Sequence, residues 1–190
     1  HLIKVNNGQN IVEYTYDSQG IRIGKKVNND EIKYLVDDMN PYAQVVEERD
    51  SKGELIVSYT YGNDLISQNR KGTKHYYIYD GHGNTRALTD VAENITDTYN
   101  YDAFGIMIDK QGDTVNNYLY CGEQYDANVG FYYLRARYMN PNTGRFFTMD
   151  TYEGNRYDPV SLHKYLYCNA EPINNIDPSG YYTLAELAMT

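Results

Sequence analysis

A pair of tyrosines separated by one residue recurs along this chain and restricts the folds that it can adopt. In an extended strand the two rings of such a pair lie on the same face, because side chains alternate with a period of two. Neighbouring copies are spaced mostly by about twenty residues, a period that indicates stacked supersecondary units. The copies begin at Tyr14, Tyr59, Tyr77, Tyr99 and Tyr118. The chain is therefore expected to repeat one small unit.

Each unit is predicted to be a strand, a tight turn and a returning strand. An Asp-x-x-Gly sequence follows three of the tyrosine pairs, at residues 17–20, 80–83 and 102–105. The aspartate can cap its own turn through its side chain, and the glycine accepts a positive φ. Apolar residues then return, as in 21–23 and 106–108. The sequence therefore predicts a mainly β fold of antiparallel hairpins.

Composition narrows the class of protein. The 190 residues leave room for one domain. Tyrosine accounts for 23 residues and tryptophan is absent, so the core should contain rings whose hydroxyls need hydrogen-bond partners. The formal net charge of -9 argues against a nucleic-acid partner held through a general basic surface. With a mean hydropathy of -0.71 and no long apolar run, no membrane span is expected.

Short motifs add little further chemistry. The four histidines are scattered, so no metal site is expected, and no nucleotide-binding motif suggests a cofactor. Cys121 and Cys168 are expected to be buried thiols, with a disulfide in an exported protein as the alternative. Short helices are predicted at 158–165 and from Thr183 onward. The chain opens with His1 and carries no signal peptide, so we expect a fragment of a longer protein.

From Tyr77 onward the order of the segments becomes specific. The segments are Tyr77-Ile78-Tyr79-Asp80, Tyr99-Asn100-Tyr101-Asp102-Ala103-Phe104-Gly105, Gly122-Glu123-Gln124-Tyr125-Asp126, Gly130-Phe131-Tyr132-Tyr133-Leu134-Arg135-Ala136-Arg137-Tyr138, Thr143-Gly144-Arg145-Phe146, Asp150 and Asp177-Pro178-Ser179-Gly180. In this order they resemble the YD repeats and repeat-associated core of RHS proteins. The resemblance assigns 1–76 to divergent YD repeats, 77–181 to the core and 182–190 to the start of a variable C-terminal region.

The resemblance implies an architecture and a set of partners. RHS proteins, which include polymorphic toxins, toxin-complex subunits and teneurins, wind YD repeats into a hollow β shell that the core closes. This chain is thus expected to be a curved or spiralling antiparallel sheet, wet on both faces, with one or two short helices near its C-terminus. Its partners would be the rest of the shell and its own C-terminal effector, with cognate secretion or immunity proteins. It would belong to a secreted or cell-surface bacterial protein.

Cleaving members of the family resemble aspartyl proteases that act on their own chain, and the matching carboxylates here are Asp150 and Asp177. In such a pair one carboxyl keeps a proton, so that one group activates water while the other donates a proton. The cut would follow Asp177-Pro178-Ser179-Gly180, after Tyr181. Arg145 is a candidate for supporting a carboxylate or the developing oxyanion, with a structural salt bridge as the alternative. Enzyme activity would thus be limited to self-cleavage.

Other interpretations stay open for these residues. Asp177-Pro178-Ser179-Gly180 is also a β-turn sequence, and Tyr181 stands where many cleaving members have leucine. Arg135 and Arg137 are expected to pack against aromatic rings rather than to take part in catalysis. Without a cut, the chain would be a non-catalytic extracellular scaffold or adhesion module whose aromatic stripes bind glycans.

Overall fold

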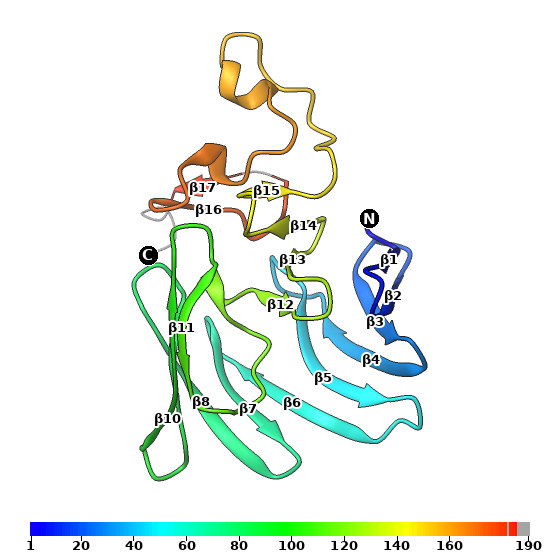
Figure 1. Cartoon of the computed structure of the whole chain (residues 1–190), viewed down its shortest axis with the longest axis vertical. Coiled ribbons are helices and arrows are strands. Elements are labelled where there is room, and N and C mark those ends of the chain that lie inside the picture. The colour runs from blue at the N-terminus through cyan, green and yellow to red at the C-terminus, as the bar shows by residue number, and fades with distance from the viewer. Residues whose placement is uncertain (182, 186–190) are drawn as a thin grey trace.

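Eleven antiparallel strands form one continuous, curved sheet in the computed structural model, which describes residues 1–181 and 183–185 (Figure 1). Each strand pairs with the next one along the chain, as expected for a series of hairpins. The strands are β1 (Lys4–Asn6), β2 (Ile11–Tyr16), β3 (Arg22–Val27), β4 (Asp30–Asp37), β5 (Gln44–Asp50), β6 (Leu55–Tyr61), β7 (Leu65–Arg70), β8 (Thr73–Tyr79), β9 (Thr85–Thr89), β10 (Ile95–Tyr101) and β11 (Met107–Gln111). Because β1 does not pair with β11, the sheet is an open trough, and the prediction of a curved, mainly β fold is confirmed.

In four copies of the tyrosine pair, the first tyrosine is part of the core and the second forms a hydrogen bond to the preceding hairpin. The first ring is buried on the inner face of the trough, in Tyr14, Tyr59, Tyr77 and Tyr99. The second tyrosine lies at a shift in strand register and donates its hydroxyl to a carbonyl of the preceding hairpin. These bonds join Tyr16 to Leu2 (2.6 Å), Tyr61 to Val45 (3.1 Å), Tyr79 to Leu65 (2.8 Å) and Tyr101 to Thr85 (3.0 Å). The repeat thus supplies both the core and the links between units.

The aspartate that follows a tyrosine pair closes the hairpin turn, as predicted. In Asp17, Asp80 and Asp102 one carboxylate oxygen accepts the backbone N–H groups of the residues two and four positions later. Asp50 and Asp90 close two further turns in the same way. The glycine at the fourth turn position has a positive φ, 83° at Gly20 for example. Turn geometry is therefore encoded locally in each repeat.

A smaller sheet lies over one end of the trough, above the large sheet in the view of Figure 1. Its strands are β12 (Gln124–Asp126), β13 (Phe131–Leu134), β14 (Arg137–Asn140) and β15 (Arg145–Phe146). Arg22 of β3 joins the two sheets, because its guanidinium lies 3.9 Å from the ring centre of Tyr133 and donates to Tyr138 Oη at 2.8 Å. The expectation of a wall wet on both faces is therefore wrong here, since the small sheet and the segment 115–119 together keep water from the inner tyrosines.

The fifth copy of the motif has a different structure. Tyr118 makes only an isolated bridge to Gln124. Tyr120 begins η1 (Tyr120–Gly122), a 3-10 helix of one turn. Both rings are buried, and Tyr118 packs edge-on against Tyr59 at 5.0 Å between ring centres. The segment follows the inner face of the large sheet, where its backbone carbonyls accept bonds from wall side chains. The prediction of a fifth hairpin is therefore wrong.

Helical structure in the described residues is limited to single 3-10 turns. The predicted helix at 158–165 is reduced to η2 (Pro159–Leu162), and η3 (Cys168–Ala170) is the third such turn. Near the end of the chain, β17 (Leu184–Ala185) pairs with β16 (Asn175–Ile176), so the predicted helix does not begin at Thr183. The rest of that prediction, from Glu186, lies outside the described residues. Both cysteines are free, which confirms the prediction of thiols.

Candidate active site

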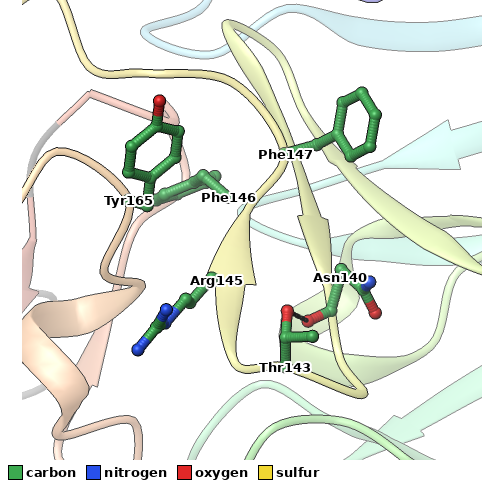
Figure 2. Close-up of a pocket in the computed structure, with 6 residues that line it drawn as sticks. All are labelled: Asn140, Thr143, Arg145, Phe146, Phe147 and Tyr165. Carbon is green, nitrogen blue, oxygen red and sulfur yellow. Dashed lines mark hydrogen bonds between the residues drawn. The ribbon is translucent and has the colours of Figure 1, made fainter.

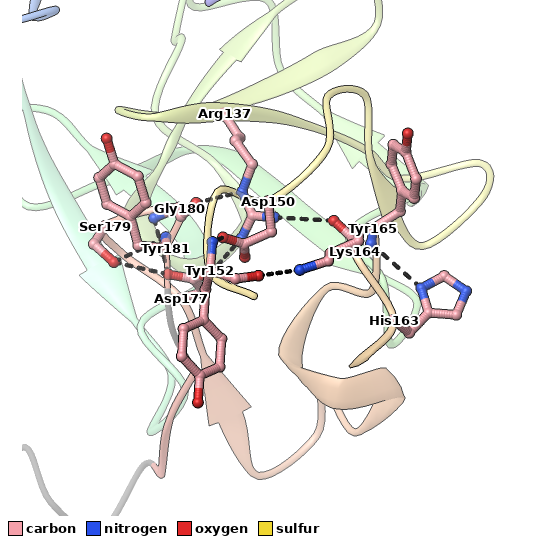
Figure 3. Close-up of polar contacts among 10 residues, drawn as sticks. All are labelled: Arg137, Asp150, Tyr152, His163, Lys164, Tyr165, Asp177, Ser179, Gly180 and Tyr181. Carbon is pink, nitrogen blue, oxygen red and sulfur yellow. Dashed lines mark hydrogen bonds and ion pairs between the residues drawn. The ribbon is translucent and has the colours of Figure 1, made fainter. Parts of the chain in front are cut away.

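Arg137 brings the two predicted aspartates together. Its Nη2 atom lies 2.8 Å from Asp150 Oδ2 and 3.6 Å from Asp177 Oδ2 (Figure 3). The two carboxylate oxygens are therefore no further apart than the sum of these distances, although 26 residues separate them in the chain. The three side chains are 6%, 15% and 2% exposed for Arg137, Asp150 and Asp177. Little water reaches this ionic group, so its electrostatic interactions are weakly screened.

The tight turn predicted at Asp177-Pro178-Ser179-Gly180 is present and positions one carboxylate. Asp177 Oδ1 accepts the Gly180 N–H at 2.8 Å and the Ser179 hydroxyl at 3.0 Å. Gly180 has a φ of 72°, a conformation that favours glycine. Because Oδ1 is used within the turn, Oδ2 is the oxygen directed at Arg137. The same Asp177 side chain thus closes the turn through Oδ1 and contacts Arg137 through Oδ2.

Asp150 is held by the backbone on the other side of the site. Its N–H donates to the Lys164 carbonyl at 2.9 Å, and its Oδ1 accepts the Tyr152 N–H at 2.9 Å. The chain between Asp150 and Lys164 leaves the small sheet as an excursion that includes η2 and then returns (Figure 1). The long spacing between the two aspartates is therefore taken up by a local loop.

The guanidinium changes the electrostatics expected for a pair of carboxylates. Burial lowers the pKa of Arg137, and the carboxylates of Asp150 and Asp177 oppose this shift. An arginine stays protonated in proteins, so its positive charge offsets part of the repulsion between the two close carboxylates. Arg137 also packs over the Phe146 ring, 3.6 Å from its centre. The predicted ring packing of Arg137 is present, and its contact with the aspartates is the feature that sequence reasoning missed.

Arg145 lies away from this group. Arg145 and Phe146 are neighbours on β15, so their side chains leave opposite faces, and Phe146 is the one that lies beneath Arg137. Arg145 is exposed and lines a surface depression of about 560 Å³ (Figure 2). The other residues of the depression are Asn140, Thr143, Phe146, Phe147 and Tyr165. In the described part of the chain, the arginine next to the predicted aspartates is Arg137.

Arg135 supports the same turn from the end of β13. It forms a 2.7 Å ion pair with Glu123 and lies 5.3 Å from the centre of the Tyr42 ring. Burial raises the pKa of Glu123, and Arg135 opposes this shift. The alternation of Arg135 and Arg137 in the sequence was the only signal for this role. It did not reveal that a two-residue turn at 135 and 136 separates the two strands and directs both guanidinium groups to residues 177–180.

The site can hold charge and orient a peptide. Within residues 1–181 and 183–185, no three His, Cys, Asp or Glu side chains are grouped as a metal would require. In the same part of the chain, no helix is long and apolar enough to cross a membrane. A pair of carboxylates with an adjacent guanidinium is suited to general acid–base chemistry on a neighbouring peptide bond.

Sequence relatives match most of this chain but only a small part of their own length. The chain is 37% identical over 174 residues to the tRNA3(Ser)-specific nuclease WapA of Bacillus spizizenii and to the tRNA nuclease WapA of Bacillus subtilis. Each match covers 89% of this chain and 7% of the relative. Salivary gland surface protein 1 of Aedes aegypti is 27% identical over 211 residues, which cover 98% of this chain and 6% of that protein.

Solved structures show the same fold at low sequence identity. The TcdB2-TccC3-Cdc42 crystal structure superposes with a TM-score of 0.68 at 19% identity, over 95% of this chain and 9% of that one. A Tc holotoxin pore of Photorhabdus luminescens gives a TM-score of 0.65 at 19% identity, over 94% and 9%. The chain thus spans less than a tenth of each of these proteins. The family described as Teneurin YD-shell matches residues 1–173, and the chain therefore belongs to this family of RHS-type shells.

Proposed function

We propose that this chain is the core segment of a bacterial YD-repeat shell that encloses or presents a C-terminal effector and cuts itself after Tyr181. The observation that supports the proposal is the shared Arg137 Nη2, which holds Asp150 and Asp177 next to the turn that precedes the cut. The two WapA relatives are named as nucleases, which fits an effector of the toxin class. Such a protein would be secreted or displayed at the cell surface.

The cut requires one proton to leave water and one to reach the departing nitrogen. One carboxylate accepts a proton from a water molecule as its oxygen bonds to the Tyr181 carbonyl carbon. The other carboxyl donates its proton to the Tyr182 nitrogen as the C–N bond breaks. Arg137 stabilises the negative charge that passes between Asp150 and Asp177. The substrate is already in place because it belongs to the same chain.

The rest of the shell would pair with the free edges of the trough. In the described residues β1 and β11 each have only one neighbouring strand, so each presents unpaired backbone donors and acceptors. Further YD repeats would continue the sheet at these edges.

The intact mass of the purified chain, followed over time at mildly acidic to neutral pH, tests the proposal. We expect the wild type to lose residues 182–190, and Asp150→Asn and Asp177→Asn to stay full length. Asp38→Asn, which changes an exposed aspartate far from the turn in sequence, is the matched control and should be cut like the wild type. A wild type that keeps its full mass would instead support the scaffold or glycan-binding alternative.

A further inference from the structure

Three consecutive residues at the tip of the β13–β14 hairpin donate hydrogen bonds to three consecutive carbonyls of the cleavage motif. The donors and the carbonyls are paired in ascending order of residue number on both segments. The pairs are Arg135 Nη1 with Pro178 O at 2.5 Å, Ala136 N with Ser179 O at 3.2 Å, and Arg137 Nε with Gly180 O (Figure 3 draws the Arg137 contact). We call this set of contacts the carbonyl clamp. It binds the backbone carbonyls of 178–180, the three residues before Tyr181.

The clamp is itself fixed by partly buried contacts. Arg135 Nη1 also contacts both oxygens of Glu123, at 2.7 and 2.8 Å, so this carboxylate orients the guanidinium toward Pro178. The Glu123 side chain is 12% exposed and that of Arg135 26%. Arg137 is held by Asp150 through Nη2, which leaves Nε for Gly180. The donors are therefore in place before any reaction begins.

The clamp binds main-chain atoms, and position 180 has no space for a side chain. A Cβ at Gly180 would lie 2.2 Å from the Leu134 carbonyl oxygen and 3.0 Å from the Arg137 nitrogen. Any side chain at 180 would therefore push the motif away from the hairpin. By contrast, Tyr181 is 50% exposed, and its N–H donates to the Ser179 hydroxyl at 3.1 Å. Its ring is not enclosed as a recognition pocket would enclose it.

We propose that Arg135, oriented by Glu123, is a positioning residue of the self-cleavage site, and that the carbonyl clamp selects glycine at 180 while accepting varied side chains at 181. This inference rests on the proposed function. It explains how a chain whose Tyr181 side chain is half exposed would still present its backbone in register. Main-chain bonds give binding and register, whereas the lack of space at 180 excludes any residue with a side chain there.

Self-cleavage rates of matched variants test the specificity. We expect Tyr181→Leu and Tyr181→Ser to be cut within about threefold of the wild-type rate, and Gly180→Ala to be slowed by about a hundredfold or more, because small misplacement of a reacting group has effects of that size. Gly112→Ala is the matched control, since Gly112 also has a positive φ and a Cβ there would lie 2.4 Å from a backbone carbonyl. It should lose stability but keep its cleavage rate.

Substitutions of Arg135 test the positioning role. We expect Arg135→Gln to slow the cut by about a hundredfold, and Arg135→Lys to recover part of the rate because it keeps a charged donor. Arg49→Gln is the control: Arg49 also pairs with a glutamate and donates to a backbone carbonyl, but it lies on β5. Equal rates for Arg135→Gln and the wild type, or no cut in Tyr181→Ser, would overturn the inference and leave the proposed function standing.

Amide hydrogen exchange separates the two proposals. In the uncut Asp150→Asn background, Arg135→Gln should speed exchange of the Ala136 N–H, which the clamp directs to Ser179. A wild type that is never cut would overturn the proposed function. In that case, faster exchange of the Ala136 N–H in Arg135→Gln would still show that the carbonyl clamp holds residues 178–180. Unchanged exchange would reject the clamp as well.

Discussion

Arg137 Nη2 lies 2.8 Å from Asp150 Oδ2, and the two side chains are only 6% and 15% exposed. A buried ion pair adds little net stability over apolar packing, but removing one partner leaves the other charge uncompensated. The same guanidinium also reaches Asp177, at 3.6 Å, and the Gly180 carbonyl. The pair therefore couples the stability of the small sheet to the geometry of the candidate site.

Asp150→Asn should destabilise the chain, although Asp177 limits the loss by remaining near Arg137. We expect the free energy of unfolding to fall by about 1–3 kcal/mol. Urea unfolding followed by tyrosine fluorescence measures this change. Asp38→Asn, in an exposed position, should alter the value by less than about 0.5 kcal/mol. Equal effects of the two substitutions would show that the ion pair contributes nothing to the fold.

Tyr79→Phe should weaken the link between consecutive repeats. The substitution removes the hydroxyl that donates to the Leu65 carbonyl at 2.8 Å and leaves the ring in place. We expect a loss of about 1 kcal/mol, the usual net value of an intramolecular hydrogen bond. Tyr157→Phe is the control, because Tyr157 is 88% exposed. A denaturant midpoint that shifts equally in both variants would contradict the linking role of Tyr79.

The local chemistry of the repeats could be predicted from the sequence, whereas their burial and contacts across the chain could not. Asp17, Asp80 and Asp102 close their turns as expected, because an aspartate caps its own turn whatever surrounds it. Tyr118 was expected to continue this pattern, but contacts with Tyr59 on a distant strand hold it outside any hairpin. Tertiary packing decides such positions, and the linear motif does not record it.

The same limit applies to the candidate site. Asp150 and Asp177 were identified through a family resemblance, and their common neighbour Arg137 was assigned to ring packing. Alternation along a strand places Arg135 and Arg137 on one face, but a two-residue turn between β13 and β14 intervenes. That turn directs their donors to successive carbonyls of another segment. Such a match depends on how two distant segments meet, which periodicity alone does not determine.

Cys121 and Cys168 should be unreactive in the folded chain. Burial raises the pKa of Cys168 to about 12 and that of Cys121 well above its usual range, so almost no thiolate forms near neutral pH. A chromogenic thiol reagent should therefore react slowly with the native chain and rapidly with both cysteines in urea. Failure to detect either thiol in urea under non-reducing conditions would show that the two are joined in a disulfide.

Stability should fall steeply in alkali because buried tyrosines resist ionisation. Burial raises the pKa of Tyr61, Tyr99 and Tyr138 to about 12, from 10.0 in an exposed phenol. Above pH 10 the unfolded chain loses these protons while the folded chain keeps them, so unfolding becomes more favourable as the pH rises. This contribution is fully present below pH 10 and is lost as the pH rises through about 12.

Ultraviolet absorbance of tyrosinate, measured in parallel with urea unfolding, tests this alkaline transition. We expect the native chain to ionise only its exposed tyrosines before it unfolds, and the urea-unfolded chain to ionise all of them together near pH 10. Tyr99→Phe should make the fall in stability with pH shallower, because one buried phenol no longer titrates. Tyr157→Phe should leave the slope unchanged. Matching titration curves for the native and unfolded chains would contradict the burial of these hydroxyls.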